Sequence, residues 1–593
     1  MKSVKIGPYT VTIAGETGPF TPTLTAREAE PGVFLVDLTL TADAAAEPGP
    51  LTLGWEHPSI DIQAYWDTGC DWSRSKGVNW SGGRTSKATS QAPVAALFDG
   101  AGRNRLTFAF SDALHPVKYK AGVVEETGLY DCHFKLFTEP GSARTHYAAT
   151  LRLDTRDVPY YDSLAAVTDW WAGLPGYTPA LVPDVARRPM YSTWYSMHQN
   201  VTPEAIEAQC RLAGELGCHA VIVDDGWQTA DSARGYGYTG DWQPAPERIP
   251  DMAAHVRRVH ALGLKYLLWY SVPFVGVHSK AYKRFEDKLL STQQFDMGDA
   301  FGILDPRFPD VRAYLIETYE NALRDWDLDG FKLDFVDSFS LPQEKQHGTD
   351  PRRDLESVDE AVDVLLTDVM ARLRTIKPDV CVEFRQSYVG PLMRKYGNMF
   401  RAGDCPNDAL SNRIKTLDIR LLCGDTAAHA DMTMWRADEP VEAAAQQILY
   451  TLFAVPQISV LLDTLPTDHL EMVRWWLGFW NDNRDVLLDG KLQPLHPELL
   501  YPIVLASTEQ KRVIAAYADM VLRTGPNVPE TLWIVNGTSE PRLVVELSEG
   551  LGPRRLTVRD CRGHIVREED VTLDAGLYSW HMPPSGTLCL SRP

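Results

Sequence analysis

Lys332 and Asp334 stand two residues apart at the end of a short β-prone run, residues 329–334. Side chains alternate along a strand, so both would point the same way. A cation on that side keeps a carboxylate ionised and aims it, as a nucleophile that attacks a sugar carbon requires. The structural alternative is that Asp334 caps the next helix and Lys332 is an ordinary ion-pair partner. Asp334 is the best catalytic candidate in the chain.

Two adjacent carboxylates, Asp224 and Asp225, follow another β-prone run and precede Gly226 and Trp227. Carboxylates accept strong hydrogen bonds, and a vicinal pair can hold several hydroxyls of one ligand. A helix N-cap and a divalent-metal site are the alternatives. We expect hydroxyl recognition.

Asp404 provides a second acidic group, three residues after Arg401 at the end of a run at 398–403. Two carboxylates on either side of a sugar are the minimal apparatus of glycoside hydrolysis, and a separation of about 5 to 5.5 Å would predict retention of configuration. As the acid, Asp404 needs a raised pKa. Arg401 would oppose this and would instead hold Asp404 in place.

Tryptophans lie near several of the same predicted strand ends, at Trp194, Trp269 and Trp435. Each one taken alone is more often a core residue than a ligand platform. Around one rim, however, they would form aromatic walls for a sugar ring.

Composition excludes several classes of function. The 593 residues carry 58 Lys and Arg against 79 Asp and Glu, a net charge of −21 with no basic stripe, so nucleic acid is not an expected partner. We expect no membrane partner, because the N-terminus lacks an apolar export signal and no apolar run reaches the roughly 18 to 20 residues that span a bilayer. Nine scattered cysteines without a Cys-x-x-Cys pair suit a reducing cytoplasm, and no zinc motif is present.

The order of predicted strands and helices along the sequence indicates three domains. Short β-prone runs separated by turn residues predict an N-terminal β-sandwich at 1–165, and β-like runs return in a C-terminal β-sandwich at 491–593. Strands alternate with helices over 166–490; Thr202, for example, is a plausible N-cap for a helix that ends at Gly217.

Eight candidate strands lie in that central region, near 190–195, 219–224, 265–271, 330–334, 380–385, 398–403, 427–434 and 457–462. Eight strands that alternate with helices over about 300 residues predict a (β/α)8 barrel, whose chemistry sits at the carboxyl ends of its strands. A doubly wound open sheet is the competing topology, but no Gly-x-Gly-x-x-Gly follows the first strand.

The central third resembles glycoside hydrolase family 36, the melibiase-type α-galactosidases, in the clan that also holds families 27 and 31. The likeness covers about residues 190–465. It rests on an ordered set of segments: 224–227, 240–242, 246–250, 262–269, 304–306, 309–312, 332–334, 403–404 with Arg413 and Lys415, and 428–429.

The resemblance implies a retaining double displacement with Asp334 as nucleophile and Asp404 as general acid and then base. It implies that Asp224 and Asp225 bind the C4 and C6 hydroxyls and that Lys332 binds another. It also implies Trp194 and Trp269 as aromatic walls. No metal or organic cofactor is needed, because carboxyl groups carry out both the nucleophilic attack and the proton transfer.

The sequence departs from the family pattern at several places. The glycine-rich segment that contacts the C2 hydroxyl is replaced by residues 381–388, where Arg385 would contact a substituent or pair with a carboxylate such as Glu383. Asp408 is a weaker candidate for the acid, and Asp337 is a fallback nucleophile. A loop with Trp66 and Trp72 would either wall the pocket or pack at a domain interface.

We therefore expect a cytoplasmic, retaining exo-α-glycosidase, most like an α-galactosidase, that acts on an oligosaccharide or glycoside. A homo-oligomer is one option for its assembly. A transglycosylase of the raffinose-synthase kind would use the same residues, and an α-glycosidase of other sugar specificity is a further alternative. A non-catalytic sugar-binding protein is the rival of another class; it predicts a missing carboxylate, whereas both are present.

Overall fold

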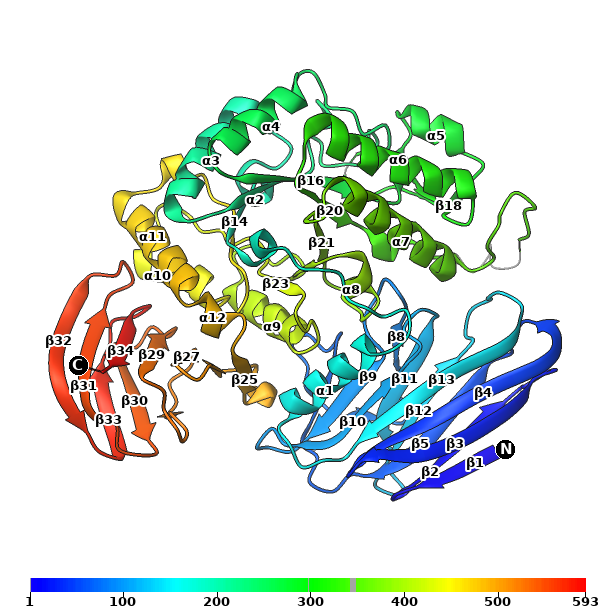
Figure 1. Cartoon of the computed structure of the whole chain (residues 1–593), viewed down its shortest axis with the longest axis horizontal. Helices are drawn as coiled ribbons and strands as arrows, with labels where there is room; N and C mark the ends of the chain where they lie inside the picture. The colour runs from blue at the N-terminus through cyan, green and yellow to red at the C-terminus, as the bar shows by residue number, and fades with distance from the viewer. Residues whose placement is uncertain (1, 297, 342–347, 593) are drawn as a thin grey trace.

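The computed structural model describes residues 2–296, 298–341 and 348–592. Its centre is a parallel sheet whose eight strands lie side by side in chain order (Figure 1). These are β14 (Met190–Ser192), β15 (Ala220–Val223), β16 (Lys265–Ser271), β20 (Gly330–Asp334), β21 (Cys381–Arg385), β22 (Met399–Arg401), β23 (Ala427–His429) and β24 (Gln457–Ile458). β24 pairs with β14, and a parallel bridge from His429 to Val455 links the remaining edges. The predicted barrel is confirmed, with each strand inside its predicted range.

Helices follow the strands and surround the sheet. The longer ones are α3 (Pro203–Leu216), α4 (Met252–Ala261), α6 (Pro309–Trp326), α7 (Val358–Ile376), α9 (Ala409–Arg420), α10 (Val441–Leu449) and α11 (Thr467–Asp482); the short ones are α2 (Trp194–Met197), α5 (Lys280–Phe285), α8 (Met393–Tyr396) and α12 (Arg484–Leu487). The predicted cap is present, because the side chain of Thr202 accepts from the Ala205 N–H and Gly217 is left-handed. A small antiparallel sheet of β17 (Phe274–Gly276), β18 (Leu289–Gln293) and β19 (Phe301–Leu304) lies between β16 and β20 in the chain.

The N-terminal region is a sandwich of two sheets whose apolar side chains share one core. One sheet contains β1 (Lys2–Ile6), β2 (Tyr9–Gly15), β5 (Leu51–Pro58), β12 (Leu129–Leu136), β11 (Val117–Val123), β7 (Gly77–Val78) and β8 (Arg84–Ser86). The other contains β3 (Thr21–Glu30), β4 (Val33–Ala46), β13 (Arg144–Asp154), β10 (Asn104–Phe110), β9 (Val94–Phe98) and β6 (Ala64–Asp67). Helix α1 (Tyr160–Ala172) then packs against this sandwich, where the Trp171 indole donates to the Phe110 carbonyl at 2.9 Å.

The C-terminal region is again built of two sheets. The larger one holds β25 (Lys491–Leu495), β26 (Ile503–Ser507), β27 (Lys511–Ala516), β29 (Thr531–Asn536), β34 (Thr587–Ser591), β31 (Gly552–Arg559) and β32 (Ile565–Leu573). The smaller one holds β28 (Leu522–Arg523), β30 (Arg542–Leu547) and β33 (Gly576–His581). The domain limits at 165 and 490 stay predictions. The last strand of the N-terminal sandwich ends at Asp154; at the other limit, α12 ends at Leu487 and β25 begins at Lys491.

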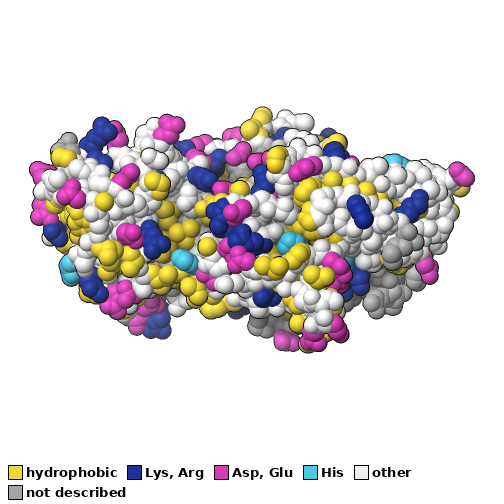
Figure 2. All heavy atoms as spheres, turned by 90° about the horizontal axis from the view of Figure 1, so that it is seen from below, with side chains coloured by type: hydrophobic (Ala, Val, Ile, Leu, Met, Phe, Trp, Pro, Cys, Tyr) yellow, Lys and Arg dark blue, Asp and Glu magenta, His cyan; other side chains and the backbone are white. Residues whose placement is uncertain are grey.

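Basic and acidic side chains alternate over the face seen from below (Figure 2), and the Lys and Arg residues there do not gather into one stripe. Within the described ranges, every helix is too short or too polar to cross a membrane.

Candidate active site

The polar residues predicted at strand ends lie at the carboxyl ends of neighbouring barrel strands. Lys332 and Asp334 close β20, and Arg385 closes β21. Arg385 is also the register partner of Arg401, the last residue of β22. The parallel order of the strands therefore brings these groups to one mouth of the barrel.

Asp334 is buried and is held by four hydrogen-bond donors. Its Oδ1 accepts from the Phe335 N–H at 2.8 Å, from Arg385 Nε at 2.7 Å and from the Tyr388 hydroxyl. Its Oδ2 accepts from the Trp269 indole at 3.0 Å. This arrangement fixes the orientation of the carboxylate from both sides.

Two cations keep Asp334 ionised. Burial alone would raise the pKa of this carboxyl, but the charges of Arg385 and Lys332 and the bonds from Tyr388 and Trp269 bring the pKa well below its usual range. Asp334 therefore carries a negative charge at neutral pH, as a nucleophile must.

Lys332 reaches across to Asp224, and the two form a buried ion pair with an Nζ–Oδ2 distance of 2.6 Å. Asp225 accepts instead from two amides, Gln199 Nε2 at 2.7 Å and Gln228 Nε2 at 2.6 Å. Burial raises the pKa of Asp225 to about 7 despite these bonds. The two adjacent carboxylates thus occupy different electrostatic environments.

Gly226 permits this arrangement. Its φ is +120°, and a Cβ there would lie 2.4 Å from the Cα of Gln199. A side chain at this position would therefore push away the residue whose amide holds Asp225.

The predicted aromatic walls differ in placement. Trp269 is buried beside Asp334, and its ring stacks on Tyr236 with centroids 6.3 Å apart. Trp194 is half-buried in α2, edge-on to His198 and beneath the Arg234 guanidinium. Trp435 is 4% exposed and donates to His469, which agrees with the alternative that it is a core residue.

Arg401 is fully buried and bridges several acidic groups. Its Nη2 lies 2.9 Å from Asp404 Oδ1, its Nη1 pairs with Asp431, and its Nε is 3.7 Å from Glu383. Sequence reasoning missed Asp431, which also accepts from the Tyr195 hydroxyl at 2.8 Å. Its position two residues after the predicted Ala-His pair at 428–429 is the signal that could have indicated it.

The expected raised pKa of Asp404 is wrong for this structure. Burial does raise the pKa, but Arg401, Lys332 and Arg385 together lower it below the ordinary value. The alternative role considered for Arg401, holding Asp404 in place, agrees with the ion pair.

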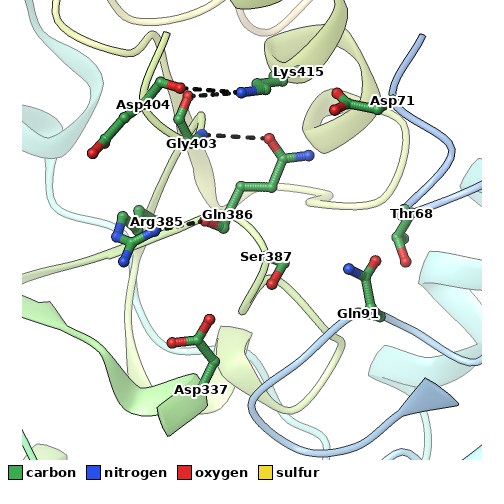
Figure 3. Close-up of a pocket in the computed structure, with 11 residues that line it drawn as sticks. Thr68, Asp71, Gln91, Asp337, Arg385, Gln386, Ser387, Gly403, Asp404 and Lys415 are labelled. Atoms are coloured by element: carbon green, nitrogen blue, oxygen red, sulfur yellow. Dashed lines mark hydrogen bonds between the residues drawn. The ribbon is translucent and has the colours of Figure 1, made fainter. Parts of the chain in front are cut away.

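A cavity of about 410 Å³ opens beside Asp404 (Figure 3). Its lining is almost entirely polar and comes from both the barrel and the N-terminal sandwich: Thr68, Gly69, Asp71, Gln91, Asp337, Arg385, Gln386, Ser387, Gly403, Asp404 and Lys415. Arg385 both lines this cavity and donates to Asp334, so it connects the cavity wall to the nucleophile candidate.

The two fallback residues have different environments. Asp337 lines the cavity, where burial and the neighbouring Asp334 raise its pKa while Arg385 opposes them. Asp408 is the N-cap of α9 and accepts from the Ser411 N–H at 3.0 Å and from its hydroxyl at 2.6 Å. A structural role accounts for Asp408.

The sandwich loop is anchored to the barrel by a buried cluster. Asp418 of α9 accepts from the Trp66 indole at 2.8 Å, from Arg74 at 3.1 Å and from the Tyr501 hydroxyl at 2.6 Å. Trp66 therefore packs at the domain interface, while Trp72 is 51% exposed and donates to Ser411. The loop between them, including Thr68 and Asp71, is thereby held against the cavity.

Among the described residues, no group of three or more His, Cys, Asp or Glu side chains is arranged to hold a metal ion. The predicted residues form two groups. Trp269 and Arg385 bind Asp334, and Lys332 pairs with Asp224 beside Asp225; Arg401 pairs with Asp404 in the second group. Arg385 and Lys332 act electrostatically on both Asp334 and Asp404, which connects the two groups. Among the described residues, the ring of Trp194 contacts His198 and Arg234, which belong to neither group.

The family model described as Melibiase matches residues 184–395. Alpha-galactosidase AgaA of Geobacillus stearothermophilus is 28% identical over 178 residues, which is 28% of this chain and 24% of that protein. The A type blood alpha-D-galactosamine galactosaminidase of Flavonifractor plautii is 25% identical over 202 residues, 30% of this chain and 18% of that protein. These matches span about a quarter or less of the length of the curated relatives.

A solved structure covers far more of the chain. A variant of the GH36 alpha-galactosidase AgaA from Geobacillus stearothermophilus, in complex with 1-deoxygalactonojirimycin, superimposes with a TM-score of 0.66 at 16% identity. It covers 98% of this chain and 83% of that chain, so the three-part fold is shared. The predicted resemblance to the melibiase-type family 36 is confirmed.

Proposed function

We propose that this chain is a melibiase-type glycoside hydrolase, a retaining exo-α-glycosidase that removes a terminal α-linked sugar. The observation that carries the proposal is the environment of Asp334 and Asp404. One carboxylate is buried, fixed and ionised, the other borders a polar cavity, and the same two cations act on both.

Asp334 attacks the anomeric carbon in the first step, and Asp404 gives a proton to the departing oxygen. The geometry supports this assignment of roles. Donors to both carboxylate oxygens fix the orientation of Asp334, while Asp404 is half-exposed beside the polar cavity that could hold the leaving group. In the second step Asp404 takes a proton from water, which attacks the glycosyl-enzyme.

Asp404 must first gain a proton. Its pKa is low in the free protein because the positive charge of Arg401 stabilises the ionised carboxylate. Burial raises the pKa of this carboxyl, and the Asp404 side chain is 52% exposed in the free protein. A sugar that fills the cavity would exclude water from Asp404, so we infer that substrate binding raises this pKa.

Galacto-configured sugars are the first substrate class to test, since the curated relatives carry the name alpha-galactosidase. The experiment is a panel of aryl α-glycosides (galacto, gluco and N-acetylgalacto) with the β-L-arabinopyranoside, followed by proton NMR of the first-formed anomer. Retention releases the α-anomer from the three α-glycosides and the β-anomer from the β-L-arabinopyranoside. Release of the opposite anomer, or turnover of none of the panel, would contradict the proposal.

Transglycosylation is the second candidate, and the polar cavity beside Asp404 favours it. Its amide and hydroxyl groups, such as Gln91, Gln386 and Ser387, could orient an acceptor sugar as well as a leaving group. Product analysis with and without an added acceptor separates the two reactions.

A cytoplasmic location is also proposed. All nine cysteines are free, and eight of them are buried, which suits a reducing compartment.

A further inference from the structure

A second cavity, of about 620 Å³, lies at the edge of the N-terminal sandwich. It opens between β6 of one sheet and β11 of the other, and the segment at residues 73–84 forms its rim. The 67–73 loop separates it from the candidate active site: Thr68, Gly69 and Asp71 line the catalytic cavity, whereas Asp67, Cys70 and Ser73 line this one.

The cations in its wall already have protein partners. Lys76 donates to the Ile62 carbonyl at 2.9 Å, Lys120 to the Ser81 carbonyl at 2.7 Å, and Arg84 to Asp67 at 3.2 Å. An anionic ligand would have to compete for these groups. The wall also holds the hydroxyls of Ser73, Ser75 and Tyr65. The two serine hydroxyls bond one another at 2.8 Å, and a hydroxyl oxygen with one such bond can still accept from a neutral polar ligand.

Trp80 contributes the apolar part of this cavity and is 74% exposed. A single exposed apolar side chain is common, but an indole that lines a cavity offers a flat ring to a ligand in that cavity. It stands in a turn fixed by backbone bonds: the Asn79 N–H donates to the Val123 carbonyl at 2.9 Å, and the Ser81 N–H to the Val78 carbonyl at 3.0 Å. The ring is therefore presented on a rigid support.

A flat aromatic ring beside several hydroxyls suits a ligand with an apolar C–H face and a polar edge, which describes a pyranose. We propose that this cavity is a second, non-catalytic carbohydrate-binding site, with Trp80 as the stacking platform. The choice of a sugar as the ligand rests on the proposed function of the barrel. The site would hold a remote part of an oligosaccharide or a second molecule of it.

The test is fluorine NMR of the full chain labelled with 5-fluorotryptophan, with Asp334→Asn as the background so that substrate is not consumed. Trp80→Phe identifies the Trp80 resonance. Stachyose and maltotetraose are the probes. We expect the Trp80 resonance to shift in a saturable manner with one of them. Isothermal titration calorimetry with the same probe measures the affinity of the variants that lack this resonance, and Trp80→Ala should weaken it about tenfold or more.

The controls separate this proposal from the function of the barrel. Trp80→Phe should retain most of the affinity because a ring remains, and Leu577→Ala, an equally exposed residue elsewhere, should retain all of it. Hydrolysis of an aryl α-glycoside by Trp80→Ala should equal that of the parent protein. If no aryl glycoside is hydrolysed but the Trp80 resonance still shifts, the barrel proposal fails and this one stands.

Two outcomes would overturn the proposal. One is a Trp80 resonance that neither probe moves at any concentration reached. The other is a resonance that moves with protein concentration instead, together with a change of oligomeric state in Trp80→Ala by light scattering, because Trp80 would then lie at an interface between copies of the chain.

Discussion

Arg385 Nε donates to Asp334 Oδ1 at 2.7 Å, and the same guanidinium lies over the Phe335 ring, 5.0 Å from its centroid. The arginine thus sits between the nucleophile candidate and the polar cavity. In this structure Arg385 pairs with a carboxylate, which is one of the two roles that the sequence left open. The partner is Asp334 and not Glu383.

Asp334→Gly should abolish turnover, because it removes the carboxylate assigned to form the glycosyl-enzyme. A loss of at least about 10³-fold is expected. Azide should restore turnover and give the β-glycosyl azide, detected by NMR. Wild-type turnover in this variant would remove Asp334 from the nucleophile role.

Arg385→Gln should shift the acid limb of the pH profile of kcat/KM upward. Arg385 lowers the pKa of Asp334, and activity needs the ionised carboxylate, so without the guanidinium activity should be lost at a higher pH than in the parent. Tyr388→Phe should shift the limb the same way by less. Arg436→Gln, which removes an exposed arginine paired with Asp438, is the matched control; an unchanged acid limb in both active-site variants would refute this positioning role.

Asp404→Ala should slow hydrolysis of an oligosaccharide by about 10² to 10⁴-fold, because its leaving group needs a proton. A dinitrophenyl glycoside leaves without one, so its glycosylation step should be nearly unaffected. The two substrates are compared by steady-state and pre-steady-state kinetics.

Asp408→Ala tests the weaker candidate for the acid and is compared with Asp404→Ala. It removes an N-cap, so it should lower the free energy of unfolding by about 1 kcal/mol and leave kcat intact. If Asp408→Ala loses the oligosaccharide activity and Asp404→Ala does not, the acid has been assigned to the wrong residue.

Asp225→Asn should change how stability depends on pH. The folded pKa of Asp225, about 7, lies above that of an unfolded aspartate, so its contribution to stability is present below about pH 4 and is lost as the pH rises through 7. The variant should lose this slope, up to about 1.4 kcal/mol per pH unit between pH 4 and 7. Urea unfolding at a series of pH values measures it; parallel curves for the two proteins would count against a raised pKa.

Asp418→Asn should destabilise the whole chain. It leaves the buried Arg74 without its carboxylate partner, a change that typically costs about 3 to 5 kcal/mol. Calorimetry should show a lower Tm. Asp438→Asn, in an exposed pair, should leave the Tm unchanged within error; an equal shift in both would mean that the cluster does not join the domains.

The sequence by itself determined the barrel and the residues at its mouth. Alternation and turn residues locate each of the eight strands, and in a parallel barrel the residue that ends a strand must lie at the carboxyl-end rim. Asp334, Asp224 and Lys332 could therefore be assigned to one region from local patterns alone.

Only the tertiary structure decided which of these groups are partners. Lys332 pairs with Asp224 and Arg385 with Asp334, while Arg401 bridges Asp404 to Asp431. Periodicity gives the face on which a side chain lies, but a pKa depends on charges brought near by other strands, and for Asp404 those charges reversed the expected direction. The buried contact of Trp66 with Asp418 likewise joins segments whose distance along the chain leaves no local signal.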